Sequence, residues 1–267
     1  KRILGYLDFA LMQENDDATR IMSLGLRASK VRVLGNLKFD HDLDENENAI
    51  TGELQERFGI ASDAPLIIAA STHSPEEKWI LDAFKEIWKS SSDNLPRLML
   101  APRHPERFDE VAALMKATGF TWVRRSEKVS SRDKTAEIIL LDSIGELRAA
   151  YPLAEAVFVG GSLIPHGGQS IFEPAATGKA IITGSYTANF EASVNEFLDK
   201  YALIQLEKVT EKTAASTLAT AFGDLLKDEK KRKELGLNAL EVMEHNRGAA
   251  VRTIDYITPM LKSRGAR

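Results

Sequence analysis

Short apolar runs alternate with amphipathic stretches through most of the chain. The runs have the length of buried strands, and most are followed by a stretch with the periodicity of a helix. We expect strands at residues 66–70, 97–101, 120–124, 138–141, 156–159, 180–183 and 203–206. We expect intervening helices at residues 75–89, 105–118, 144–151, 170–177 and 189–200. Strands buried on both faces and joined by crossover helices predict an α/β fold with a Rossmann-like, doubly wound parallel sheet.

The two ends of the chain show other patterns. Residues 9–13 and 31–34 have the character of strands, and between them a helix capped by Asn15 ends at Gly25. This unit is too small to form a domain alone, so we interpret residues 1–40 as the last piece of a preceding domain in a longer protein. After the last strand only helices are expected, at residues 213–226, 229–246 and 249–261.

A polar, partly acidic segment separates the first piece from the rest. Residues 41–64 have the composition of a linker, with a short helix expected at 50–58. The sequence therefore predicts a linker over 41–64 and a Rossmann-like domain with terminal helices over 65–267.

Composition narrows the choice of partners. The 267 residues include 35 Lys plus Arg and 39 Asp plus Glu, and the formal charge of −4 gives no basic field for nucleic acid. Cysteine is absent, which excludes disulfides and thiolate metal sites, and the five histidines lie too far apart in the sequence for a zinc-type spacing. No apolar run approaches the roughly 20 residues that cross a bilayer. A reducing, cytoplasmic compartment is the expected setting.

The strongest candidate site is the turn after residues 156–159. Two glycine pairs allow a ligand to approach the backbone, and the second pair should open a helix whose N–H groups and dipole suit a phosphate. Glu173, expected one turn into that helix, could accept hydrogen bonds from two ribose hydroxyls. A flexible loop with a carboxylate near a helix start is the alternative. The candidate binding residues of this turn are Gly160, Gly161, Ser162, Gly167, Gly168, Gln169, Ser170 and Glu173.

The turn after residues 66–70 offers hydroxyl groups. Ser71 and Thr72 could hold a ligand anion, since parallel sheets bind ligands beyond the carboxyl ends of their strands. Ser74 precedes Pro75 and stands three residues before Glu77, so a helix cap explains it equally well.

Two further turns carry candidates. Arg103 and His104 follow residues 97–101, and a guanidinium at a strand end suits a phosphate or carboxylate. A surface ion pair of Arg103 with Glu106 or Asp109 is the alternative. Asn189 follows residues 180–183 and could either reach a sugar or cap the next helix.

Missing motifs exclude several classes of enzyme. The first strand of the domain is not followed by GxGxxG, and no Walker loop, GxSxG turn or HExxH helix is present. Dehydrogenase, NTPase, hydrolase and zinc protease functions therefore lose support.

The order of the motifs resembles the C-terminal half of the 3-deoxy-D-manno-octulosonic acid (Kdo) transferases specific for lipid A, which are GT-B glycosyltransferases. The resemblance covers nearly the whole chain, and one departure is Gln169-Ser170, where the family more often has His-Asn. The matching motifs are GNLKFD at 35–40, ASTHSPEE at 70–77, PRHPER at 102–107, VGGS at 159–162, GGQSIFE at 167–173 and NF at 189–190.

The resemblance implies an inverting transfer of Kdo from CMP-Kdo to a lipid A precursor during lipopolysaccharide biosynthesis, at the cytoplasmic face of the bacterial inner membrane. It implies that the residues above bind the donor, while the general base, most acceptor contacts and the link to the membrane belong to an N-terminal domain outside this chain. No catalytic residue is therefore expected here, and the fragment alone should be inactive.

The leaving group is CMP, which carries a single phosphate. Arg103 and the N–H groups of residues 167–170 could stabilise it, so we expect neither a divalent metal nor a cofactor. The alternatives are another GT-B enzyme, such as a UDP-sugar transferase or a UDP-GlcNAc 2-epimerase, and a nucleotide-binding module with no activity of its own.

Overall fold

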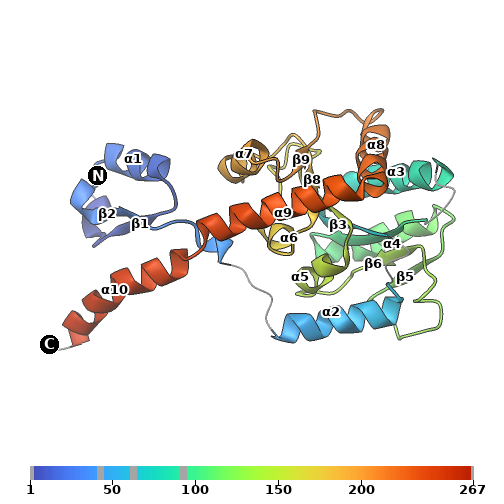
Figure 1. The fold of residues 1–267 in the computed structure, drawn as a ribbon, viewed down its shortest axis with the longest axis horizontal. Helices are drawn as coiled ribbons and strands as arrows, with labels where there is room; N and C mark the ends of the chain where they lie inside the picture. The colour runs from blue at the N-terminus through green and yellow to red at the C-terminus, as the bar shows by residue number, and fades with distance from the viewer. Residues whose placement is uncertain (1–2, 41–44, 61–64, 91–94, 266–267) are drawn as a thin grey trace. The chain divides into compact units, whose positions relative to one another are not determined.

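The chain forms two compact units (Figure 1). The computed structural model describes residues 3–40, 45–60, 65–90 and 95–265, with side chains to residue 261. We call Lys1–Asp42 with Met243–Arg267 the terminal unit, and Leu43–Val242 the central unit. This division differs from the predicted one, because the last residues of the chain belong to the same unit as the first residues and not to the unit that contains the sheet.

The central unit contains a seven-stranded, wholly parallel sheet in the order β5-β6-β4-β3-β7-β8-β9. From β3 the chain builds outward to one edge, then returns to place β7 on the other side of β3. This reversal is the switch point at which doubly wound sheets bind ligands. The strands are β3 (Leu66–Thr72), β4 (Arg97–Pro102), β5 (Trp122–Arg124), β6 (Ile138–Leu140), β7 (Ala156–Val159), β8 (Ala180–Thr183) and β9 (Ile204–Gln205). The predicted strands and the Rossmann-like fold are confirmed.

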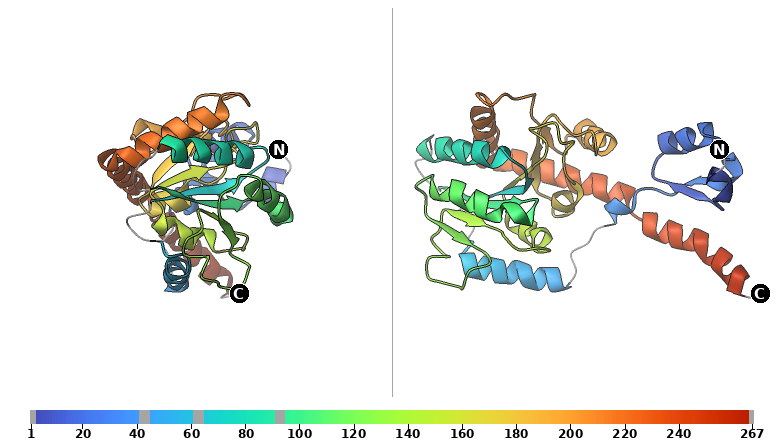
Figure 2. Two further views of the ribbon diagram at one scale, coloured as in Figure 1. Left: turned by 90° about the vertical axis from the view of Figure 1, so that its right-hand side faces the viewer. Right: turned by 180° about the vertical axis from the view of Figure 1, so that it is seen from behind.

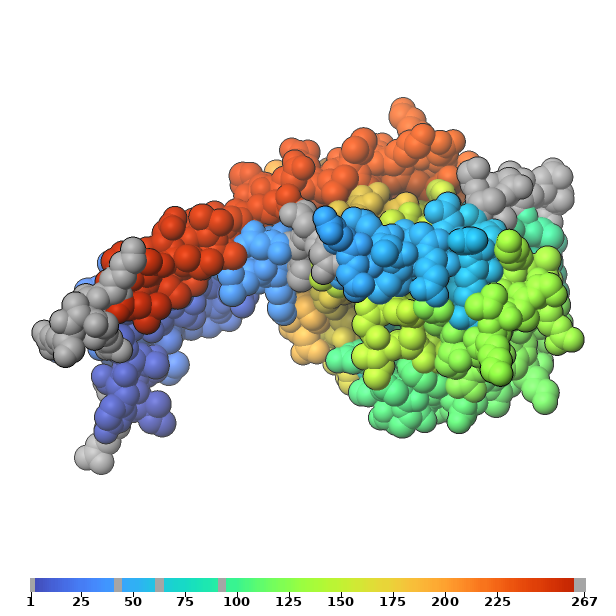
Figure 3. All heavy atoms as spheres, turned by 90° about the horizontal axis from the view of Figure 1, so that it is seen from below, coloured from blue at the N-terminus to red at the C-terminus, as the bar shows by residue number. Residues whose placement is uncertain are grey.

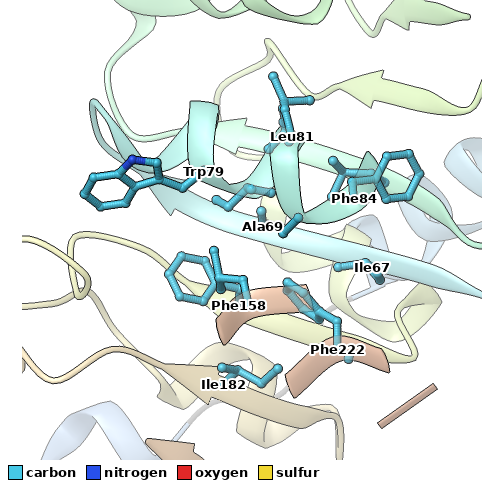
Figure 4. Close-up of a cluster of buried hydrophobic side chains, with 14 of the residues drawn as sticks. Ile67, Ala69, Trp79, Leu81, Phe84, Phe158, Ile182 and Phe222 are labelled. Carbon is cyan, nitrogen blue, oxygen red and sulfur yellow. The ribbon is translucent and has the colours of Figure 1, made fainter. Parts of the chain in front are cut away.

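Helices cover both faces of this sheet. The left view of Figure 2 shows the sheet between α3 and α8 on one side and α2 on the other. Figure 4 shows part of the core, where side chains of β3, β7 and β8 pack with Trp79, Phe84 and Phe222 from α3 and α8. The helices are α2 (Glu45–Phe58), α3 (Glu76–Ser90), α4 (Phe108–Lys116), α5 (Leu147–Ala150), α6 (Phe172–Ala176), α7 (Glu191–Asp199), α8 (Ala214–Lys227) and α9 (Glu229–Asn246).

The predicted linker contains a longer helix than expected. Figure 3 shows α2 lying along the surface of the central unit. The acidic side chains in its first turn are stabilised by the positive end of the helix dipole. Leu54 and Phe58 of this helix are fully buried. The Arg57 guanidinium makes a buried ion pair with Asp133, with 2.8 Å between Nε and Oδ2. Residues 45–58 are thus a packed helix, and the predicted linker residues 41–44 and 61–64 lie outside the described residues.

The terminal unit joins the beginning of the chain to its last helix. Parallel strands β1 (Ala10–Met12) and β2 (Val31–Val33) flank α1 (Asn15–Ser23), as predicted, although Glu14 rather than Asn15 occupies the cap position. The Asp40 carboxylate accepts hydrogen bonds from the N–H groups of Gly248 and Ala250, both at 2.6 Å, at the start of α10 (Ala249–Gly265). No helix in the described part of the chain has the length and apolar character needed to span a bilayer.

Candidate functional site

The turns that follow β3, β4 and β7 meet at the switch point of the sheet. The N–H of Arg103 donates to the Thr72 carbonyl at 3.0 Å, and the N–H of Gly160 donates to the Ala70 carbonyl at 2.8 Å. The three turns that the sequence singled out are therefore joined through their backbones.

A buried carboxylate, which the sequence did not single out, fixes this arrangement. Glu76 has 0% of its surface exposed and opens α3. Its Oε2 accepts hydrogen bonds from the N–H groups of His73 at 3.0 Å and Gly161 at 2.7 Å. Its Oε1 accepts from Ser162 at 3.0 Å and Leu163 at 2.9 Å. Burial raises the pKa of Glu76, and these four bonds act in the opposite direction.

The neighbouring glutamate has a different task from the predicted one. The sequence suggested that Glu77 completes a helix cap with Ser74. Instead, Glu77 is buried and forms a two-pronged ion pair with Arg107, at 2.6 and 3.1 Å, which raises the pKa of Arg107. The carboxylate that reaches back to the turn is Glu76. Two glutamates at the start of a helix are usually exposed, so the sequence offered little sign that Glu76 and Glu77 are buried. The one signal was their position directly after the candidate turn of Ser71 and Thr72.

The glycine pairs allow other atoms to approach the backbone closely, but in this structure those atoms belong to other turns of the protein and not to a ligand. A Cβ on Gly160 would lie 2.7 Å from both the Ser71 carbonyl oxygen and the Thr72 Cα. A Cβ on Gly167, whose φ is +99°, would overlap the Asn189 amide. Glycine is thus required here for packing, whether or not a ligand also approaches.

We expect Gly160→Ala to lower the free energy of unfolding by about 1–3 kcal/mol, because the added methyl group must displace backbone rather than a flexible side chain. Urea unfolding measures the change. Gly223→Ala in α8 is the control, since its Cβ would meet nothing within 4 Å. The control should gain about 0.5–1 kcal/mol. An equal effect of both variants would contradict the packing role of Gly160.

The second glycine pair does not open a helix, contrary to the prediction. Helix α6 begins at Phe172, and the N–H of Gly168 is already bonded to the Gly161 carbonyl at 2.8 Å. Glu173 is the second residue of α6 rather than one turn into it. Burial, and then the nearby charge of Glu173, raise the pKa of Tyr151 well above its ordinary value.

Five of the predicted binding residues line one open hollow of about 490 Å³, which we call hollow A. They are Ser71, Arg103, Gln169, Ser170 and Glu173. The other lining residues are Ala101, Pro102, Pro105, Phe108, Leu141, Ser143, Ile144, Gly145, Leu147 and Arg148.

Arg103 is exposed in hollow A, and within the described part of the chain it makes no ion pair. The alternative pairs with Glu106 and Asp109 are not formed. Asp109 instead bonds Arg124 at 2.7 Å, and the carboxylate of Glu106 lies 3.7 Å from His104. The guanidinium is therefore available to an anion in the hollow.

Gly167 and Asn189 line a second hollow of about 420 Å³, hollow B, together with His166. The Asn189 amide donates to the His166 carbonyl at 3.2 Å. Helix α7 follows Phe190 as its cap, so Asn189 does not cap that helix. Seven of the thirteen predicted binding residues therefore line the two hollows. Thr72 and Ser162 are fully buried, and neither hollow is lined by His104, Gly160, Gly161 or Gly168.

Three of the five histidines come together although they are far apart in the sequence. The ring centroid of His73 lies 4.1 Å from that of His166 and 5.3 Å from that of His104. Burial, and next the proximity of His166, lower the pKa of His73. Among the residues that the structure describes, no group of three or more His, Asp or Glu side chains is arranged to hold a metal ion.

The first part of the chain matches a known family, and nearly the whole chain is similar to a known protein. Residues 1–41 match the family described as 3-deoxy-D-manno-octulosonic-acid transferase (kdotransferase). The 3-deoxy-D-manno-octulosonic acid transferase of Haemophilus influenzae is 35% identical over 250 residues, which cover 94% of this chain. The chain spans 56% of that relative, a little more than half its length.

Solved structures agree with the fold. The C-terminal CMP-Kdo binding domain of WaaA from Acinetobacter baumannii is 29% identical with a TM-score of 0.66, covering 75% of this chain and 99% of that one. HepE from Anabaena, solved in complex with UDP and glucose, has a TM-score of 0.58 and covers 96% of this chain and 63% of that one. At 14% identity it supports the GT-B fold alone. By its sequence and its fold, this chain belongs to the Kdo transferase family.

Proposed function

We propose that the protein transfers Kdo from CMP-Kdo to a lipid A precursor, and that this chain holds the donor. The observation that carries the proposal is the similarity to a CMP-Kdo binding domain across 99% of that domain. Hollow A supports it, because its volume of about 490 Å³ lies within the range of small-molecule sites.

Hollow A offers complementary groups for a nucleotide. Glu173 can accept hydrogen bonds from ribose hydroxyls, and Arg103 can pair with the phosphate from the same hollow. Ser71 and Ser170 add hydroxyl groups to its lining. A carboxylate and a guanidinium in one hollow suit a ligand with neutral hydroxyls at one end and an anion at the other.

The proposal assigns this chain one half of an inverting transfer. Such a reaction requires a base on the acceptor hydroxyl and a group that stabilises the charge of the departing phosphate. Arg103 serves the departing CMP, and we assign the base and the acceptor contacts to the rest of the protein. Since the acceptor is a lipid, we place the reaction at the cytoplasmic face of the inner membrane.

The proposal is tested by titrating the chain with CMP, UMP and UDP and by assaying Kdo transfer with the full-length protein. We expect CMP to bind more tightly than either uridine nucleotide, and only the full-length protein to transfer Kdo. Tighter binding of UDP would favour a UDP-sugar enzyme. Transfer by the chain alone would contradict its role as a donor-binding part.

We expect Glu173→Gln to weaken CMP binding about tenfold, because a hydrogen bond to a charged group contributes about 1.5–3 kcal/mol. Isothermal titration calorimetry measures the affinity, and the melting temperature checks the fold. Glu211→Gln, at an exposed position outside both hollows, is the control. Unchanged affinity of the Glu173 variant would remove this residue from the binding site.

A further inference from the structure

The histidine cluster joins the linings of the two hollows. His73 Nδ1 lies 3.1 Å from the carbonyl oxygen of Ser71, which lines hollow A. The His73 ring packs against His166, which lines hollow B. A ligand with one bulky part in each hollow would therefore carry its connecting group past His73.

Two polar atoms at this position are buried without a partner in the described part of the chain. They are the hydroxyl oxygen of Thr72, a fully buried residue, and Nε2 of His73, a residue of which 7% of the surface is exposed. Buried polar atoms are nearly always bonded, and the exceptions often mark binding sites. Because the Ser71 carbonyl can only accept, Nδ1 carries the proton of the neutral ring, and Nε2 is the atom that can gain one.

We propose that Thr72 and His73 bind an anionic oxygen of the donor, and that His73 takes up a proton when that oxygen binds. The inference rests on the proposed function and adds a second anion contact to it, separate from Arg103. The donor has two groups of this chemistry, its phosphate and the carboxylate of its sugar. Either group adjoins the bond that links nucleotide and sugar, which is the part of the ligand that would pass between the hollows.

The charged and titratable groups around His73 determine the direction in which its pKa is shifted in the free chain. His166 from the turn after β7 and His104 from the turn after β4 lower the pKa of His73, while Glu77 of α3 raises it less. The Glu76 carboxylate binds the His73 backbone N–H. Burial is the largest influence and lowers the pKa of His73, so the free ring stays neutral to a lower pH than an ordinary histidine. An anion at Nε2 favours the charged ring, so binding raises the pKa and takes up a proton.

The pKa of His73 can be followed by NMR of the histidine ring protons of this chain, with His73→Asn identifying its signal. The titration is run without ligand and with saturating cytidine, CMP or Kdo. We expect CMP or Kdo to raise the pKa by about 1–3 units and cytidine to leave it unchanged. A rise with CMP identifies the phosphate, and a rise with Kdo identifies the carboxylate.

The outcomes separate this inference from the proposed function. If CMP binds but neither CMP nor Kdo moves the pKa of His73, the inference is wrong and the proposed function stands. If neither compound binds, the proposed function fails and the inference fails with it.

Affinity provides a second measurement, made between pH 7 and 8.5 with the compound that moved the His73 pKa. Between the pKa of His73 in the free chain and its higher pKa in the complex, affinity should fall by up to about tenfold for each unit rise in pH, and above the pKa of the complex it should level off. A phosphate monoester titrates near pH 6, so the charge of CMP stays constant over this range, as does that of a carboxylate. His73→Asn should bind about tenfold more weakly and show no such slope. His245→Asn, at an exposed histidine outside both hollows, should behave as the parent chain.

Thr72→Val distinguishes binding from a structural role. The substitution removes a buried hydroxyl that has no partner among the described residues, so the free chain should keep or raise its melting temperature. Binding of the same compound should weaken at least several-fold. A lower melting temperature with unchanged affinity would show that Thr72 supports the fold and does not contact the anion.

Discussion

Replacing Glu76 with alanine is expected to lower the free energy of unfolding by about 3–5 kcal/mol, because the buried N–H groups it binds lose their acceptor. These N–H groups belong to His73, Gly161, Ser162 and Leu163. Urea unfolding measures the loss. The stability of Glu76→Gln should lie between that of the parent chain and that of Glu76→Ala, since the amide oxygen can still accept hydrogen bonds while the amide nitrogen cannot.

Glu86→Ala is the matched control for this substitution, because Glu86 lies exposed on the same helix. Its effect should stay within about 0.5 kcal/mol. Near-native stability of Glu76→Ala would mean that the turns after β3 and β7 hold their positions without this carboxylate. If the variant still folds, its affinity for CMP should fall, since both turns contribute to the hollows.

Replacing Arg103 with alanine should weaken binding of CMP about 30- to 150-fold, which corresponds to about 2–3 kcal/mol for a charge-assisted contact. Cytidine has no phosphate, so its affinity should change little. Arg103→Lys should recover only part of the loss, because an ammonium keeps the charge but not the planar pair of donors. Calorimetric titration of both ligands measures the difference.

Arg132→Ala removes an exposed arginine that lines neither hollow and is the control. Equal weakening of cytidine and CMP by Arg103→Ala would show that the side chain positions the turn and does not pair with the phosphate. In the full-length protein the rate of transfer should fall along with the affinity, because the charge on the leaving phosphate grows in the transition state.

The sheet could be predicted from the sequence because its signal is local. Each strand is a short apolar run, and both faces of the sheet are covered, so β3 (Leu66–Thr72) and β7 (Ala156–Val159) are almost wholly buried. The turns after these strands could be identified as well, because parallel topology fixes the edge at which they lie. Arg103 after β4 and Glu173 after β7 both line hollow A, because the carboxyl ends of all these parallel strands lie at the same edge.

The remaining features depend on contacts between distant residues. Glu76 looks like an ordinary acidic residue at a helix start, yet three of its four acceptor bonds reach 85 to 87 residues along the chain to the glycine turn. The histidine cluster likewise joins residues from three different turns. Helix α6 begins later than predicted because the N–H of Gly168 bonds to the carbonyl of Gly161 within the same turn. Local helix propensities do not predict such a bond.

The bonds between Asp40 and the start of α10 constrain the order of events during synthesis. They connect residues 208 and 210 positions apart, so the partners of Asp40 do not yet exist when it leaves the ribosome. At about 5–20 residues per second, the wait is on the order of 10–40 s. The central unit, Leu43–Val242, is synthesised entirely within that interval. Translation therefore delivers the sheet first, and the terminal unit acquires its last helix only after the sheet has emerged.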